Sequence, residues 1–114
     1  MGEWFCLLRP IALNALVLSA DAVRQCSACV GTPIRAESSY WEGNIIGEVV
    51  GAEMRGDELW IRAEWSRKPT FPYVAAAVIA PRAPDETWRL FDIITTDHPL
   101  DSSMGRIPSM PFLN

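Results

Sequence analysis

The side chains best suited to covalent chemistry lie near the C-terminus. The chain contains one histidine, His98, and two serines, Ser102 and Ser103, follow it closely. An imidazole that removes a hydroxyl proton makes serine a nucleophile, so this segment has the groups of a hydrolase site. Asp97 is badly placed to orient the imidazole, because adjacent residues of an extended segment point to opposite sides. We therefore favour a surface histidine and keep His98, Ser102 and Ser103 as secondary catalytic candidates.

Three cysteines are the second set of reactive groups. Cys26 and Cys29 form a C-x-x-C pair, and Cys6 lies apart. A redox pair works where its first thiol begins a helix, whereas this pair is predicted at the end of one, where the helix dipole raises the thiol pKa. A zinc site would need Cys6 and His98 as further ligands, without a second close-spaced pair. We therefore predict buried structural thiols, no metal or cofactor, and a reducing, cytoplasmic location.

Tryptophan is abundant, with five residues in 114. Three fit apolar strand faces and are predicted to be core residues: Trp4, Trp65 and Trp88. Trp60 falls on the polar face of a predicted strand, and Trp41 follows Tyr40 in a predicted loop. Exposed aromatic side chains bury a large area at low entropic cost when a partner binds. Tyr40, Trp41 and Trp60 are therefore the candidate binding residues for a protein partner.

Other motifs that carry chemistry are missing from the sequence. There is no phosphate-binding Walker loop, dinucleotide glycine motif, zinc-protease motif or serine-hydrolase elbow. The net charge is -4 and the basic residues are scattered, which argues against a nucleic-acid partner. No apolar run is long enough to cross a membrane. We predict a single domain over residues 1–114, with a proline-containing tail over residues 98–114.

The apolar stretch at residues 11–18 shares features with a secretory signal, since the small residues Ala20 and Ala22 follow it. Glu3 precedes the stretch, however, and the single cation Arg9 comes late, next to a proline. Signal peptides begin with positive charge, so we predict that this segment is not one.

Short strands and one helix are predicted to hold these residues. Residues 4–8 are apolar and typical of a buried strand. Ser19 or Asp21 can cap the start of a helix that runs to about Val30, and Gly31 fits the left-handed position after its end. The C-x-x-C pair would then occupy the last turn of this helix.

A hairpin is the clearest structural signal. Residues 45–54 and 58–65 are two strand-like runs, the second with strict alternation of apolar and polar side chains. Gly56 lies between them and can adopt the positive φ of a tight turn. Gly47 and Gly51 are predicted on one strand face, where they would mark a bulge or a close approach of backbone.

The remaining predicted segments follow in order: extended residues 32–35, a loop over 38–43, a buried strand over 73–80, and a strand over 87–95. Trp88, Leu90 and Ile94 would share one face of the last strand. The pattern as a whole predicts an α+β fold, a mostly antiparallel curved sheet or small barrel of five to six strands with one helix.

Residues 19–65 carry four motifs in a recognisable order: Ser19-Ala20-Asp21-Ala22-Val23, Gly31-Thr32-Pro33-Ile34, Ile46-Gly47-Glu48-Val49, and Gly56-Asp57-Glu58-Leu59-Trp60-Ile61-Arg62-Ala63-Glu64. This order resembles the prohead maturation proteases of tailed bacteriophages, relatives of the herpesvirus assemblins, with a weaker continuation through residues 73–75. The resemblance implies the fold of that family and its binding of phage structural proteins.

The chain departs from that family at the catalytic positions. The resemblance places a histidine just after the glycine–proline strand, where residues 35–40 contain none. It places the nucleophilic serine in a strand such as residues 73–75, where this chain has alanine. His98 matches at most a later family histidine. The resemblance therefore implies a relative that lacks the catalytic histidine and serine.

Three functions remain open. The first is a non-catalytic protein-binding module of phage or prophage origin, with a capsid or scaffold subunit as its partner. The second is a small acidic inhibitor of a host enzyme or defence nuclease, whose carboxylates would occupy the positions of nucleic-acid phosphates. The third is a hydrolase that uses His98 with Ser102 or Ser103. The oligomeric state is left open.

Overall fold

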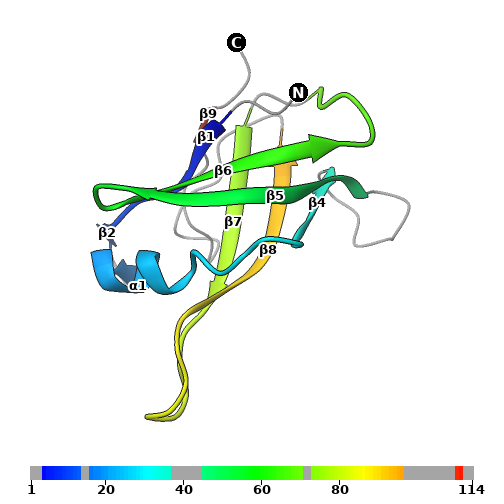
Figure 1. Ribbon diagram of the computed structural model, residues 1–114. Coiled ribbons are helices and arrows are strands. Elements are labelled where there is room, and N and C mark those ends of the chain that lie inside the picture. The colour runs from blue at the N-terminus through cyan, green and yellow to red at the C-terminus, as the bar shows by residue number, and fades with distance from the viewer. Residues whose placement is uncertain (1–3, 14–15, 37–44, 71–72, 97–109, 112–114) are drawn as a thin grey trace.

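A computed structural model describes residues 4–13, 16–36, 45–70, 73–96 and 110–111 (Figure 1). Its elements in chain order are β1 (Trp4–Leu8), β2 (Ile11–Leu13), β3 (Leu16–Leu18), α1 (Ala20–Gln25), β4 (Pro33–Ala36), β5 (Ile45–Arg55), β6 (Glu58–Trp65), β7 (Tyr73–Ile79), β8 (Arg89–Thr96) and β9 (Met110–Pro111).

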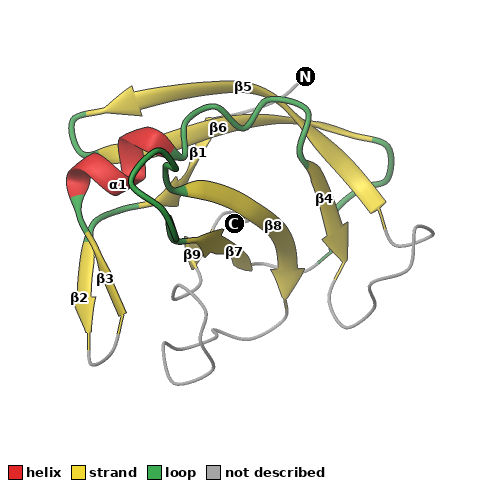
Figure 2. Cartoon of the chain, turned by 90° about the horizontal axis from the view of Figure 1, so that it is seen from below, coloured by secondary structure: helices red, strands yellow, loops and turns green. Residues whose placement is uncertain are grey.

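The main sheet has the strand order β1-β6-β5-β4-β8-β7-β9. Every neighbouring pair is antiparallel except β4 and β8, which run parallel. β7 and β8 cross beneath β5 and β6, so the sheet curls into a half-barrel (Figures 1 and 2). The predicted α+β fold with a curved, mostly antiparallel sheet is thereby confirmed.

The concave side of the half-barrel holds the core, which includes fully buried Leu59 and Ile61 of β6, Ile34 of β4 and Ile93 of β8. Alternation along β6 explains this placement, because its apolar residues point inward and its polar residues outward. α1 packs against β6 and contributes Val23 to the same core.

The structure contains more strands than the five to six that were predicted, in two places. β9 lies within the proline-containing tail and pairs with β7 through Met110 and Pro111. The apolar segment weighed as a signal peptide forms the separate hairpin of β2 and β3 and buries Leu18 in the core. This hairpin differs from the prediction, because strands of only three residues are too short to show an alternating pattern in the sequence.

The helix is shorter than predicted. Ser19 is its N-cap, since its side chain accepts a hydrogen bond from the Ala22 N–H at 3.1 Å. The last helical residue is Gln25 rather than Val30. The Ser27 hydroxyl donates to the Arg24 carbonyl at 2.6 Å. In a longer helix this carbonyl would accept a backbone N–H, so the serine side chain competes with continuation of the helix. Gly31 adopts the predicted positive φ, +96°, but it does not directly follow the helix, because Cys26 is the C-cap.

The predicted hairpin forms between β5 and β6, with Gly56 at φ +62° in its turn. The register shifts between Val49 and Gly51, which is the bulge that the glycines predicted. The bulge also overturns one expectation, that Gly47 and Gly51 share a face. Because one extra residue reverses the alternation, Gly47 lies under the Trp65 ring and Gly51 under the ring of Trp4 on the opposite face.

A second bulge lies in β8. Ala77 pairs with Asp92 and Val78 with Leu90, so Phe91 is the extra residue. The prediction that Leu90 and Ile94 share a face is therefore wrong. Ile93 enters the core instead, while Ile94 packs with Ala75 in a separate buried cluster.

Candidate functional site

The convex face of β1, β6 and β5 presents two tryptophans among charged side chains. Six residues make up this surface, which we call the Trp–Arg face: Trp4, Glu53, Arg55, Glu58, Trp60 and Arg62. The strand register pairs Trp4 with Arg62, Glu53 with Trp60 and Arg55 with Glu58, so these positions are cross-strand neighbours. Side chains on one face of paired strands interact directly.

Arg55 lies between the two indole rings. Its guanidinium carbon is 4.4 Å from the centroid of the Trp60 ring and 5.6 Å from that of Trp4. The Arg62 guanidinium lies 5.8 Å from the same Trp4 ring. Guanidinium groups at these distances are attracted to the electron-rich ring face, which fixes the orientation of both tryptophans.

Hydrogen bonds to carboxylates complete the arrangement. Arg55 donates through Nε and Nη2 to Glu53 Oε1, at 2.9 and 2.7 Å, and Trp60 Nε1 donates to Glu58 Oε1 at 3.0 Å. The side chains of Arg55 and Glu53 remain 43% and 45% exposed. The face is thus ordered by its own contacts and still reachable by a partner.

Trp4 was predicted to be a core residue and is not one. It is half-buried on the convex face, because its cross-strand partner is Arg62 of the polar side of β6. The other two predicted core tryptophans are half-buried and pack against the core, and Trp65 stacks on Phe5 with ring centroids 6.4 Å apart. The sequence of β1 alone holds no signal for this, because only the pairing with β6 reveals its outer side.

Beside this face, Glu48 of β5 lies directly opposite Glu64 of β6. Both are exposed, and within the described part of the chain neither forms an ion pair. Like charges placed opposite one another destabilise a strand pair. With the Trp–Arg face included, the described part of β5 and β6 carries more outward carboxylates than guanidinium groups.

Most of the predicted site residues lie outside the described residues: Tyr40, Trp41, His98, Ser102 and Ser103. Of the predicted binding residues, the structure places Trp60 alone, on the polar face where it was expected. Arg55, Arg62 and Trp4 were not among the candidates. The alternation of β6 signals the outward direction of Arg62, whereas the clustering depends on strand pairing.

Cys26 and Cys29 are buried, and neither forms a disulfide. Burial raises the pKa of each thiol to about 11, and the neighbouring Cys29 adds to the effect on Cys26. The predicted direction is therefore confirmed, but desolvation is its main cause rather than the helix dipole.

Cys6 is half-buried on the convex side, opposite Trp60. Burial raises its pKa, the Glu58 carboxylate raises it further, and Arg9 acts in the opposite direction. In the portion of the chain that is described, no three metal-binding side chains come together, so Cys6 does not join the C-x-x-C pair in a ligand group.

β4 and β7 are separated in the sheet by β8. Ala36 of β4 and Val74 of β7 both pair with Thr95 of β8, from its two sides. Arg35 forms an ion pair there with Asp92, at 3.5 Å, and the fully buried Thr95 hydroxyl donates to the Arg35 carbonyl at 3.4 Å. These polar groups therefore have a structural role, since they bind one another between neighbouring strands.

No helix in the described ranges is long and apolar enough to cross a membrane. Comparisons of the chain with models of protein families, with curated proteins and with solved structures gave no match.

Proposed function

We propose that this chain is a non-catalytic protein-binding module and that the Trp–Arg face is its contact surface. The observation that carries the proposal is Arg55 held between Trp4 and Trp60 on an accessible sheet face. Tryptophan and arginine are the side chains most enriched among residues that dominate binding energy in protein interfaces. Their mutual contacts hold them in place before binding, which lowers the entropic cost of association.

The partner that we propose is a phage capsid or scaffold subunit, in the cytoplasm of a host cell. Support for this choice comes from the resemblance of residues 19–65 to prohead proteases. The alanines in residues 73–77 and the lack of a histidine in residues 35–40 support a binding role rather than acyl transfer.

The test is a tagged pull-down from lysate of the source cells, with mass spectrometry of the retained proteins. We compare the wild type with Trp60→Ala and Arg62→Glu, and use Val30→Ala as the control because Val30 is 64% exposed and lies outside the Trp–Arg face. Both face variants should reduce retention of capsid or scaffold subunits by roughly tenfold or more, while the control retains them. Circular dichroism verifies that each variant is folded.

Retention that is equal in the wild type and both folded face variants would exclude this surface. Retention of no capsid or scaffold subunit would exclude the phage partner.

A second candidate is a small acidic inhibitor of a host enzyme or defence nuclease. The opposed Glu48 and Glu64 favour it, because unpaired carboxylates on a sheet face match a surface that binds phosphates. In the same pull-down, this function predicts recovery of a nuclease or other host enzyme. Glu48→Lys with Glu64→Lys should then abolish recovery, and salt should weaken it.

A further inference from the structure

The hairpin of β7 and β8 extends beyond the rest of the sheet (Figure 1). We call residues 77–91 the β7–β8 arm. β9 pairs with β7 only at Tyr73 and Val74, and β4 pairs with β8 only at residues 93–95. Among the described residues, the strands of the arm therefore pair only with each other.

The inner side of the arm is fixed to the body of the protein. Trp88 and Leu90 pack against the core, and the backbone N–H of Trp88 donates to Gln25 Oε1 of α1 at 2.9 Å. The arm is therefore held in one orientation, and its opposite side is presented to a partner without a large ordering cost.

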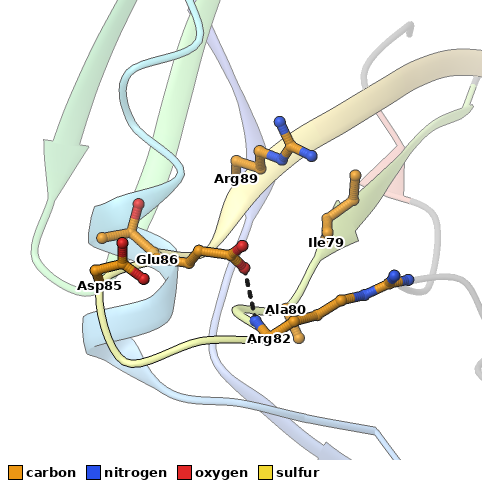
Figure 3. A pocket seen from close by; sticks show the side chains of 7 residues that line it. Ile79, Ala80, Arg82, Asp85, Glu86 and Arg89 are labelled. Atoms are coloured by element: carbon orange, nitrogen blue, oxygen red, sulfur yellow. Dashed lines mark hydrogen bonds between the residues drawn. The ribbon is translucent and has the colours of Figure 1, made fainter.

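The presented side contains an open pocket of about 510 Å³ with charges of both signs. Its lining consists of Ile79, Ala80, Arg82, Asp85, Glu86, Thr87 and Arg89. Figure 3 shows Asp85 on one side of the pocket and the guanidinium groups of Arg82 and Arg89 on the other, with Ile79 between the two arginines.

These charges do not neutralise one another within the chain. Glu86 Oε2 accepts a hydrogen bond from the backbone N–H of Arg82 at 2.8 Å. This bond orients the carboxylate and does not involve the Arg82 guanidinium. Within the described ranges, Arg82, Asp85 and Arg89 form no ion pair. Two cations and two anions therefore remain available around an apolar residue.

We propose that this arm is a self-association site, which binds the same arm of a second copy of the chain. A two-fold interface requires a patch that is complementary to itself, and a pocket lined by two arginines and two carboxylates meets that requirement. The two arginines of each copy pair with the two carboxylates of the other. Ile79 of both copies lies at the centre of the interface.

Sedimentation velocity tests this proposal over a range of protein concentrations. The interface is small and its ion pairs are exposed, so we expect a dissociation constant on the order of 10–100 µM at low salt. Raising the salt to about 1 M should shift the protein to monomer, because the Debye length falls to about 3 Å.

Charge reversal makes the test specific. Arg82→Glu with Arg89→Glu, and separately Asp85→Arg with Glu86→Arg, should each weaken self-association by roughly tenfold or more. An equimolar mixture of the two variants should restore a heterodimer, since their charges complement one another. Arg67→Glu with Lys68→Glu is the matched control: it changes the net charge as much as the arginine variant does, at exposed residues outside the arm, and should leave the dimer intact.

A wild type that stays monomeric at about 500 µM, or a dimer that neither reversal weakens, would overturn the proposal. Failure of the mixed variants to associate would also overturn it. The wild-type salt series needs no substitution, so it remains informative if a variant does not fold. Trp60→Ala should leave the dimer unchanged, which separates this proposal from the binding role of the Trp–Arg face.

Discussion

Arg55 shows how a single side chain organises the convex face. It contacts both indole rings and the Glu53 carboxylate, so the positions of three neighbouring side chains depend on this one guanidinium group. Each cation–π contact at such an exposed site contributes about 0.5–1 kcal/mol. The contribution to folding is therefore modest, and the main effect of Arg55 is to hold Trp4 and Trp60 in one orientation.

Two glycines allow ring packing against the sheet, with different tolerance to substitution. A Cβ at Gly47 would lie 2.7 Å from Trp65 Cε3 and 3.0 Å from the Glu64 carbonyl oxygen, so both ring and backbone would have to move. A Cβ at Gly51 would lie 3.0 Å from Trp4 Cη2, the far end of a ring on the open face.

We expect Gly47→Ala to reduce the free energy of unfolding by about 1–3 kcal/mol. Gly51→Ala should change it by less than about 1 kcal/mol, because the Trp4 ring can shift outward and alanine restricts the unfolded chain. Urea denaturation of both variants measures the difference. Equal losses would contradict the distinction between the two sides of β5.

At the scale of elements, the β5–β6 hairpin follows from sequence because its signals are local. Strict alternation in β6 and a glycine at the turn specify strands and turn within twenty-one residues, Ile45–Trp65. The bulges are harder to predict, since the side on which Gly51 or Ile94 emerges depends on one extra residue in the register. Trp4 likewise takes its environment from β6, which follows more than fifty residues later.

The start of α1 is another local feature that sequence could predict, with Ser19 and Asp21 as the alternatives. The structure assigns the cap to Ser19, while Asp21 forms an exposed ion pair with Arg24 at 3.1 Å. Ser19→Ala should lower the free energy of unfolding by about 1 kcal/mol, because the Ala22 N–H loses its acceptor.

Asp21→Ala is the matched control for the cap. Exposed ion pairs contribute little, so its loss should stay below about 0.5 kcal/mol. Chemical denaturation measures the free energy of unfolding of both variants. A larger loss for Asp21→Ala than for Ser19→Ala would show that Ser19 is not the residue that caps the helix.

At the scale of the whole molecule, the buried thiols make stability depend on pH. The pKa of Cys26 and Cys29 rises from an ordinary value of 9.0 to about 11 on folding, so the folded chain holds these protons more tightly than the unfolded chain. Stability from this source is fully present below about pH 9 and is lost as the pH rises towards 11.

The effect is measured as the slope of the unfolding free energy against pH between about pH 8.5 and 11. This range begins about half a unit below the ordinary thiol pKa. The slope should be smaller in Cys26→Ala with Cys29→Ala than in the wild type. Slopes are compared because the double variant also loses packing in the core. Identical slopes would show that the two thiols ionise alike in the folded and unfolded chain.

The strand order also divides the molecule in two. β1, β6, β5 and β4 come from residues 4–65, and β8, β7 and β9 come from residues 73–111. Among the residues that the structure describes, the two parts pair along one parallel seam: Ile34–Ile93, Arg35–Ile94 and Ala36–Thr95. The Arg35–Asp92 ion pair and the hydrogen bond from the Trp88 backbone to Gln25 reinforce it. A chain cut between Trp65 and Tyr73 keeps every other strand pairing of the main sheet within one fragment. We therefore expect the two fragments to reassemble when they are produced separately, which would make this fold a split reporter whose halves join when their fusion partners meet.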